Sequence, residues 1–182
     1  MGKAKAMKLY LDGDIPHRAR VWRNDPNIFK WCRQHTFISR EEQLLWEKKI
    51  VSDPTIKMFG IYDDELELDS QYGSGIGVCG FTSIDYRLSH AEFSLYIARQ
   101  FQGFGYGKEA LRLLLDHGFN DFGFNLIWGE TFDGNPAAHM FEKLGFVKEG
   151  TVRQRYLLDG KRIDAHLYSM TKEEFDALDR NC

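Results

Sequence analysis

A glycine loop between an apolar run and a helical pattern is the feature that most constrains how this chain folds. The loop Gln102-Gly103-Phe104-Gly105-Tyr106-Gly107 follows the apolar stretch 91–98 and leads into a helical pattern over 108–122. In such an arrangement successive backbone N–H groups point into the turn, and the helix N-terminus adds about half a positive charge. Glycine is needed because a Cβ would hold the backbone away from a ligand and resist positive φ. The sequence therefore predicts a site for an anionic phosphate.

The spacing of this loop separates it from two better-known phosphate loops. It is Gln-x-x-Gly-x-Gly, not the Gly-x-Gly-x-x-Gly of dinucleotide folds. Glu109 follows Gly107-Lys108, so the Ser or Thr that ends a P-loop is also missing. The loop alone leaves one alternative open, a glycine-rich turn without a ligand.

Composition limits the class of protein. The chain has 182 residues, enough for one domain with its own core, and a net charge of −3, which argues against non-specific binding to nucleic acid. No apolar run approaches the ~20 residues that span a bilayer, and the N-terminus has no signal-peptide core. The cysteines and histidines are too scattered for a disulfide framework or a metal site. We expect a cytoplasmic protein with no metal and with neither membrane nor nucleic acid as a partner.

The first half of the chain predicts strands at 8–11 and 57–62, helices at 14–23 and 27–35, and a third helix that starts at Ser39. Ser39 and Glu42 have the spacing of a capping box at the start of the third helix, and Pro54 ends it. The acidic stretch 63–69 is interpreted as a solvated hairpin loop, with an attractor for a cationic amine as the alternative.

The second half predicts helices at 108–122 and 135–144, and strands at 76–84, 92–98, 125–131, 153–158 and 162–170. Asp159-Gly160 is a hairpin signal between the last two strands, and Gly145 suits the position after a helix end. No linker or repeat interrupts the chain. We therefore predict one α+β domain over 1–182, a largely antiparallel sheet with helices on both faces.

Two ordered motifs resemble the GNAT superfamily of acyl-CoA-dependent N-acetyltransferases. The first is Gln102-x-x-Gly105-x-Gly107 between a strand and a helix, and the second is the segment 135–146, Asn-Pro-Ala-Ala-His-Met-Phe-Glu-Lys-Leu-Gly-Phe. The tail over 149–170 is similar to the branch that contains ribosomal-protein, spermidine and amino-sugar acetyltransferases. Arg23-Asn24-x-Pro26, with Trp31 and 37–39, resembles enzymes that act on a nucleotide-linked 4-amino sugar. The resemblance covers about residues 9–175 and implies a mixed, mostly antiparallel twisted sheet of about seven strands.

The resemblance also implies acetyl-CoA as co-substrate and a set of residues that bind it. Backbone amides would hold the pyrophosphate, and these belong to Gln102, Gly103, Phe104, Gly105, Tyr106, Gly107 and Lys108. Ile97 and Ala98 would offer backbone hydrogen bonds to the pantetheine arm, which inserts like an extra strand. Asn135 would contact the arm from the other side.

One departure concerns the group that protonates the leaving thiolate. Many members of the superfamily use a tyrosine, and the alignment on 142–146 puts Phe141 in its place. Tyr96 is our candidate for the acid, with Tyr106, a water molecule or unassisted departure of the thiolate as alternatives.

The attacking amine needs a base, because an ammonium group cannot attack a carbonyl. Glu92 on the strand before the loop is our candidate, acting through water, and His90 is the runner-up. An exposed residue or a salt bridge is the structural alternative for Glu92.

Candidate acceptor-binding residues come from the front of the chain: Arg23, Trp31, His35 and Phe37, with Trp22 beside them. The aromatic residues have a core role as their alternative. A buried arginine needs an anion, so Arg23 either pairs with an acid or binds a phosphate or carboxylate of the substrate.

These observations predict an N-acetyltransferase that moves an acetyl group to a primary amine by direct attack in a ternary complex. The expected acceptor is a small molecule, either an amino sugar, free or nucleotide-linked, or a polyamine. A protein N-terminal acetyltransferase is the alternative within enzymes, and a non-catalytic CoA-binding sensor is the alternative of another class. A homodimer formed through the last strands is a further hypothesis.

Overall fold

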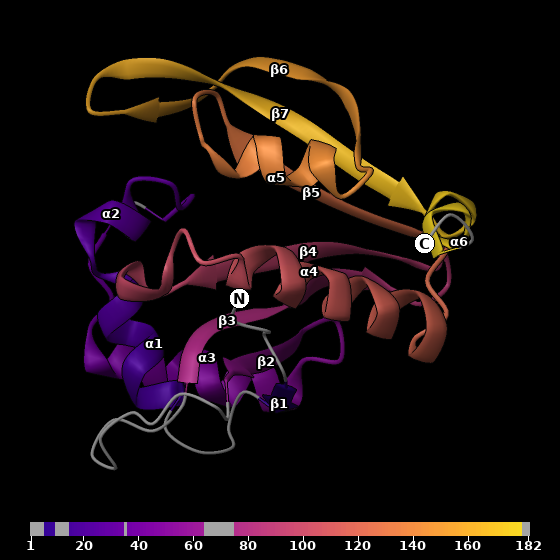
Figure 1. The fold of residues 1–182 in the computed structure, drawn as a ribbon. Coiled ribbons are helices and arrows are strands. Elements are labelled where there is room, and N and C mark those ends of the chain that lie inside the picture. The colour runs from indigo at the N-terminus through magenta and orange to yellow at the C-terminus, as the bar shows by residue number, and fades with distance from the viewer. Residues whose placement is uncertain (1–5, 10–14, 35, 64–74, 180–182) are drawn as a thin grey trace. The chain divides into compact units, whose positions relative to one another are not determined.

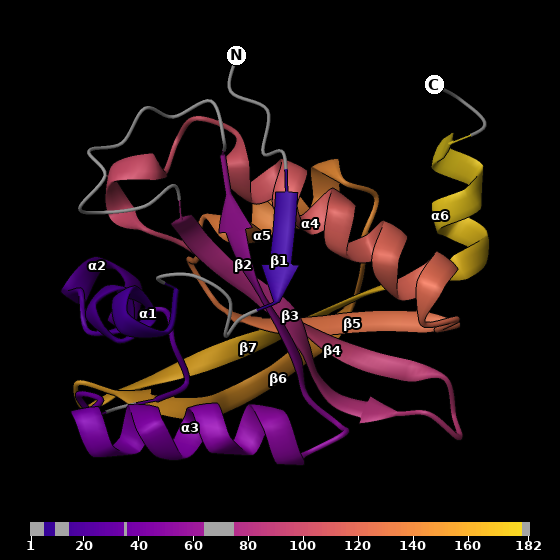
Figure 2. The same cartoon turned by 90° about the horizontal axis from the view of Figure 1, so that it is seen from below.

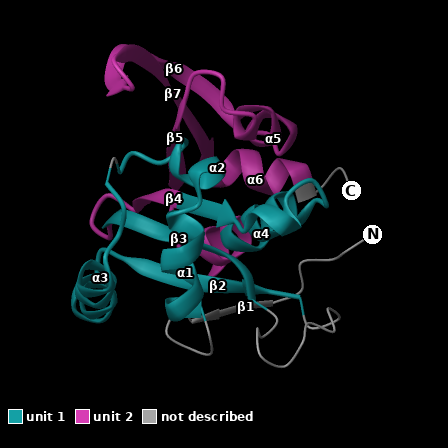
Figure 3. Ribbon diagram, turned by 90° about the vertical axis from the view of Figure 1, so that its left-hand side faces the viewer, with its two compact units in different colours: residues 1–84, 94–114 teal, residues 85–93, 115–182 magenta. Residues whose placement is uncertain are grey.

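The computed structural model describes residues 6–9, 15–34, 36–63 and 75–179. Seven strands form a sheet in the order β1-β2-β3-β4-β5-β7-β6. By contacts the chain divides into two compact units, one of residues up to 84 with 94–114 and the other of 85–93 with 115–182 (Figure 3). The unit boundaries fall inside β3, β4 and α4, so each of these elements contributes residues to both units.

The first unit combines antiparallel strands with most of the helices (Figure 1). Its strands are β1 (Ala6–Leu9), β2 (Lys57–Tyr62), β3 (Gly75–Asp85) and the second half of β4 (His90–Ile97). Its helices are α1 (Ile15–Arg23), α2 (Pro26–Phe29), α3 (Arg40–Ser52), the 3-10 turn η1 (Arg99–Phe101) and nearly all of α4 (Tyr106–Asp116). Figure 2 shows α1, α2 and α3 gathered on one side of these strands and α4 on the other.

Local sequence signals set where the front helices begin. The Ser39 side chain accepts the Glu42 N–H at 3.1 Å, and Glu42 accepts the Ser39 N–H at 2.7 Å, which confirms the predicted capping box of α3. Asp25 caps α2 in a similar way by accepting the Asn27 N–H at 2.8 Å. The predicted helix over 27–35 is wrong in extent, because α2 ends at Phe29 and turns follow it.

The core of the first unit lies between α1 and the strands. Ile15 and Ala19 are buried along one face of α1, and Trp22 joins them with 7% of its surface exposed. Met58 of β2 and Val78 of β3 belong to the same cluster. Trp22 is therefore a core residue, the structural role considered for the front tryptophans.

The second unit is built on the first half of β4 and three more strands. These are β5 (Leu126–Phe132), β6 (Val147–Leu158) and β7 (Lys161–Thr171), with the helices α5 (Ala137–Lys143) and α6 (Lys172–Asp179) and the π-helical turn η2 (His117–Asp121). Strand β4 pairs with β5 in parallel, and β5–β7 and β7–β6 are antiparallel. The α+β class and the mixed, mostly antiparallel sheet are confirmed.

The end of the chain is more regular than its sequence indicates. Asp159 and Gly160 have φ of +48° and +74° and form the tight turn that their sequence predicts. Strand β6 starts six residues before the predicted 153, and α6 follows β7 where no helix is predicted. The predicted helix 108–122 ends as an α-helix at Asp116 and continues as η2. No described helix is long and apolar enough to cross a bilayer.

Helix α5 lies beside the strands of the second unit (Figure 1), and an aromatic cluster packs it onto them. The ring of Phe141 lies edge-on to Phe93, with centroids 5.1 Å apart, and 5.6 Å from the ring of Tyr168. Gly129 of β5 lies directly beneath the Phe93 ring, where a Cβ would overlap ring atoms. Phe146 closes the cluster at 5.2 Å from Phe93, so this ring has little room to move.

We expect Gly129→Ala to destabilise the protein by about 1–3 kcal/mol, because the added methyl overpacks a closed aromatic cluster. Gly150→Ala is the matched control, since a Cβ at that strand position meets no atom within 4 Å. Urea unfolding of both variants measures the difference. Equal unfolding midpoints for the two variants would contradict the packing described here.

Candidate functional site

The glycine loop of the first unit presents open backbone at the start of a helix. Gly103 and Gly105 have φ of +84° and +91°, and a Cβ at either position would meet no atom within 4 Å. Helix α4 begins at Tyr106, and its first turn is closed by the N–H groups of Lys108 and Glu109 on the Gly105 carbonyl, at 3.1 and 3.2 Å. Left-handed glycines beside open space at a helix N-terminus have the geometry that binds phosphate.

Two hydrogen bonds, one from a side chain and one from the backbone, hold the end of β4 that precedes this loop. The Gln102 Nε2 donates to the Ile97 carbonyl at 2.8 Å, and the Ala98 N–H donates to the Ile76 carbonyl at 2.9 Å. The Ala98 N–H is thus engaged within the protein. A ligand arm alongside β4 would have to use other backbone groups, such as the Ala98 carbonyl, which already accepts the Phe101 N–H at 2.9 Å and has a second lone pair.

Tyr106 ties the start of α4 to the end of β2. Its hydroxyl donates to Asp63 Oδ2 at 2.7 Å, and both residues are buried, at 5% and 3% exposure. The interpretation of the acidic stretch as a solvated loop is therefore wrong for Asp63, and 64–69 lie outside the described residues. The Tyr106 hydroxyl proton is therefore directed at a carboxylate within the protein.

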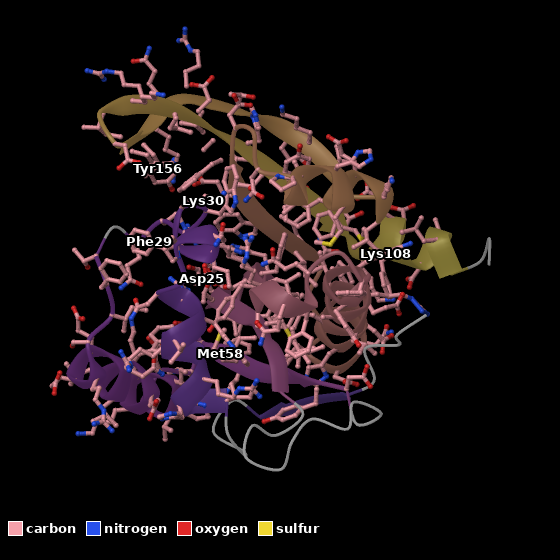
Figure 4. The ribbon with its side chains drawn as sticks, turned by 60° about the vertical axis from the view of Figure 1, so that its left-hand side comes forward. Asp25, Phe29, Lys30, Met58, Lys108 and Tyr156 are labelled. Carbon is pink, nitrogen blue, oxygen red and sulfur yellow. The ribbon has the colours of Figure 1, made fainter. Side chains whose placement is uncertain are left out.

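A cavity of about 340 Å³ lies beside β4 in the first unit. Its floor comes from β2, β3 and β4 and is made by Met58, Val78, Thr82, Ser94 and Tyr96. Its walls come from the end of α1, the segment before α3 and the first turns of α3, and are made by Arg23, Arg33, Gln34, Ile38, Glu42, Gln43 and Trp46. Figure 4 labels Met58 on the strands, with Asp25 and Phe29 at α2. The volume falls in the range of about 300–1,000 Å³ typical of small-molecule sites.

Arg23 is the predicted acceptor residue that the structure places in this wall. Its guanidinium donates to Gln34 Oε1 at 3.1 Å and lies 5.5 Å from the centre of the Tyr96 ring. A guanidinium at this distance from an aromatic ring makes a cation–π contact that fixes its orientation. Arg23 and Tyr96, predicted for different roles, therefore belong to one contact network.

Asn24 holds the segment that carries the cavity wall. Its Oδ1 accepts the Ile38 N–H at 2.8 Å, and its Nδ2 donates to the Ile38 carbonyl at 2.9 Å. Arg20 adds a longer hydrogen bond to the same carbonyl at 3.5 Å. These bonds join the end of α1 to the residue before the α3 cap, so Asn24 sets the position of the wall.

The other predicted acceptor residues lie elsewhere. Of the described residues, Trp31 and Phe37 do not line the cavity. The Lys30 ammonium lies over the Trp31 ring, 5.4 Å from its centre. The Phe37 ring stacks on the Phe29 ring with their centres 5.5 Å apart, and 67% of the Phe37 surface is exposed. His35 lies outside the described residues. The sequence interpretation missed Arg33, Gln34 and Ser94, which sit in an irregular segment or on a strand without a polar pattern.

Glu92 lies on the face of β4 opposite Phe93, as predicted. It is 5% exposed, and strand alternation puts it on the same face as Ser94 and Tyr96, which line the cavity. The structural alternative of an exposed residue is therefore wrong, although its role as a base stays a prediction. The runner-up His90 has a buried Nδ1 without a hydrogen-bond partner among the described residues.

Two predicted positions belong to the second unit. The Asn135 Oδ1 accepts the Ala137 N–H at 3.0 Å and so starts α5. Phe141 is buried in the aromatic cluster, where it has no proton to give. The hydroxyl of its neighbour Tyr168 donates to the Glu142 carboxylate at 3.2 Å. Burial is the larger cause that raises the pKa of this phenol, and the Glu142 carboxylate adds to the rise.

Comparison with known proteins gives consistent findings. A family model described as an acetyltransferase (GNAT) domain matches residues 9–147. The chain is 34% identical over 101 residues to the uncharacterized N-acetyltransferase p20 of Bacillus licheniformis, which covers 55% of this chain and 57% of that protein. The chain thus spans little more than half the length of that relative.

Similarity to a second relative extends further. The chain is 27% identical over 142 residues to spermidine N(1)-acetyltransferase of Vibrio cholerae, covering 78% of each. A crystal structure of the Vibrio cholerae spermidine N-acetyltransferase with CoA and spermine matches with a TM-score of 0.83 at 23% identity, covering 93% of this chain and 96% of that one. At that identity the structural match shows the fold.

We expect Asn24→Ala to lower the free energy of unfolding by about 1–3 kcal/mol, because two backbone groups of Ile38 lose their partners. Asn120→Ala is the control, since Asn120 makes one exposed bond to Asp116 at 2.8 Å and its loss should change the free energy by no more than about 0.5 kcal/mol. Urea titration measures both. Equal losses would show that Asn24 does not hold the wall.

Proposed function

The chain belongs to the GNAT family of acetyltransferases, and from that premise we propose that it moves an acetyl group from acetyl-CoA to the primary amine of a small molecule. The observation that carries the proposal is the pair of left-handed glycines that opens the backbone at the start of α4. It supports binding of a pyrophosphate at the place where the sequence predicts one.

The residues present fit acetyl-CoA. A Cβ on Gly103 or Gly105 would project into open space that a diphosphate can occupy. The N–H groups of 103–107 would hold the diphosphate, because those of Gln102 and Lys108 already donate to the Arg99 and Gly105 carbonyls, each at 3.1 Å. The Lys108 side chain, exposed in the first turn of α4, adds a positive charge there. Ile97 and the carbonyl of Ala98 would contact the pantetheine arm. Asn135 would contact the arm through its Nδ2, because its Oδ1 already accepts the Ala137 N–H. When bound, acetyl-CoA supplies an activated thioester.

Proton transfer is assigned to β4. Glu92, acting through water, would take a proton from the substrate ammonium, since the neutral amine is the nucleophile. The amine nitrogen then attacks the thioester carbonyl, and a backbone N–H near the end of β4 stabilises the oxyanion. The C–S bond breaks, and the nitrogen gives its second proton to water as the amide forms. Tyr96 is the proposed donor to the thiolate. Its help is not essential, because a free thiol has a pKa of about 8.5 and leaves readily.

The acceptor would enter the cavity beside Tyr96. Relatives named spermidine N-acetyltransferases support a polyamine, and the resemblance of the front segment supports a nucleotide-linked amino sugar. An acceptor panel, read by release of CoA thiol, separates these from each other and from a peptide with a free α-amino group. Tight acetyl-CoA binding with no turnover on any amine would favour the CoA-binding sensor.

We place this activity in one acyltransferase domain over 1–182, of which the family match covers 9–147. The two units share β3, β4 and α4 through chain connectivity. A homodimer through the last strands stays a hypothesis, which sedimentation velocity tests.

We expect Gly105→Val to abolish acetyl-CoA binding while the protein stays folded, because a side chain would enter the phosphate space and the residue would lose its left-handed freedom. Gly123→Val is the matched control, since Gly123 also has positive φ, at +69°, and no atom within 4 Å of a Cβ. Both variants should lose about 1–3 kcal/mol of stability from strain. Isothermal titration calorimetry reads the binding; unchanged affinity in Gly105→Val would refute the loop assignment.

We expect Glu92→Gln to lower kcat by about 10²-fold or more and to alter its pH profile, as loss of a general base does. The exposed Glu173→Gln provides the control for a general charge effect. Steady-state rates between pH 6 and pH 9 measure the change. An unaltered profile in Glu92→Gln, with the fold intact, removes this residue from the role of base.

A further inference from the structure

Among the charged residues that line the cavity beside β4, basic groups outnumber acidic ones. Its charged lining residues are Arg23, Arg33 and Glu42. Glu42 is also engaged in the α3 capping box, where its Oε2 accepts the Ser39 N–H at 2.7 Å. The remaining polar residues of the lining are neutral: Gln34, Gln43, Thr82, Ser94 and Tyr96.

Arg23 is oriented toward this space by neutral partners. In the described part of the chain its contacts are one hydrogen bond to Gln34 Oε1 at 3.1 Å and the Tyr96 ring at 5.5 Å. A guanidinium has five N–H donors in a rigid fork, so most of its hydrogen-bonding capacity remains for another group. Half-buried and paired with an amide and an aromatic ring, it favours a carboxylate or phosphate as its next partner.

Arg33 places a second positive charge at the same wall. It is exposed, and it lines the cavity with Arg23. Both charges act on the half-buried Cys32: burial raises the pKa of this thiol, and the two guanidinium groups partly offset the rise. The positive potential of this wall therefore comes from two residues on different segments.

We propose that Arg23, with Arg33 at its side, binds a carboxylate or phosphate of the acceptor, so that the substrate is an amine that carries an anionic group. The inference rests on the proposed acetyl transfer and names the acceptor class. A polycation entering this cavity would bring its ammonium groups toward two guanidinium groups. The wall thus discriminates against a polyamine, the acceptor named for the Vibrio cholerae relative.

A panel of matched amines tests this. Glucosamine, glucosamine 6-phosphate and muramic acid share an amino sugar and differ in the anionic group, and spermidine supplies the polycation. We expect kcat/KM to be at least about tenfold higher for one or both anionic amines than for glucosamine, because charge-assisted hydrogen bonds from a guanidinium to an anion are strong. We expect spermidine to be the poorest acceptor. The phosphate and carboxylate arms show which anion fits. Preference for spermidine, or equal rates for the three sugars, overturns the proposal.

Variants connect the preference to the residue. Arg23→Gln should reduce the ratio of kcat/KM between the anionic amine and glucosamine by at least about tenfold, mainly through KM. The reason is that the anion loses its bidentate hydrogen bonds to the guanidinium. Arg23→Lys should restore part of the ratio, and Arg33→Gln, at an exposed position, should lower it several-fold without disturbing the fold. Arg162→Gln, exposed on β7, is the control. A purely structural role for Arg23 would lower all rates equally and leave the ratio unchanged, which refutes the assignment.

Binding separates this proposal from the proposed activity. Calorimetric titration of glucosamine 6-phosphate and of glucosamine into the protein saturated with CoA needs no turnover. Tighter binding of the phosphorylated sugar that is lost in Arg23→Gln supports the anion site even if no amine is acetylated. Equal or absent binding of both sugars, in a protein that binds CoA, rejects the anion site and leaves the acetyl-CoA loop standing.

Discussion

A buried hydrogen bond between Tyr106 and Asp63 fixes where α4 begins. A buried phenol needs a partner for its hydroxyl, and Asp63 at the end of β2 supplies it at 2.7 Å. Tyr106 directly follows Gly105, so the same contact that anchors the helix also sets the position of the left-handed glycine before it. The loop can therefore be open on its outer side and still have a fixed backbone, which a preorganised anion site requires.

The end of strand β4 contacts both the glycine loop and the cavity wall of the first unit. Its end is held to the loop by the Gln102 side chain on the Ile97 carbonyl. The residue before Ile97 in β4 is Tyr96, whose ring makes a cation–π contact with the Arg23 guanidinium. The glycine loop and the cavity wall are thus both in contact with the end of β4. Orientation of two reactants by a common rigid element is a main source of rate in transfer reactions, because it replaces a bimolecular encounter.

Sequence reasoning succeeded where a local rule decides the structure. The Ser39–Glu42 capping box, the Asp159-Gly160 turn and the glycine loop each depend on residues close together in the chain. It failed at Asp63, because an acidic run indicates solvent and only tertiary packing shows that its first member meets Tyr106. It also predicted Phe37 as an acceptor-binding residue, whereas the Phe37 ring stacks on Phe29 at the surface and is not among the residues that line the cavity.

The cavity wall shows why shared fold and shared substrate are separate questions. A structural match at 23% identity shows a common fold and does not show a common substrate. The positive charges that line the cavity come from Arg23 at a helix end and from Arg33 in an irregular segment. The acceptor class therefore has to be inferred from this chain's own wall, where a half-buried guanidinium with neutral partners leaves an anion as the group that completes it.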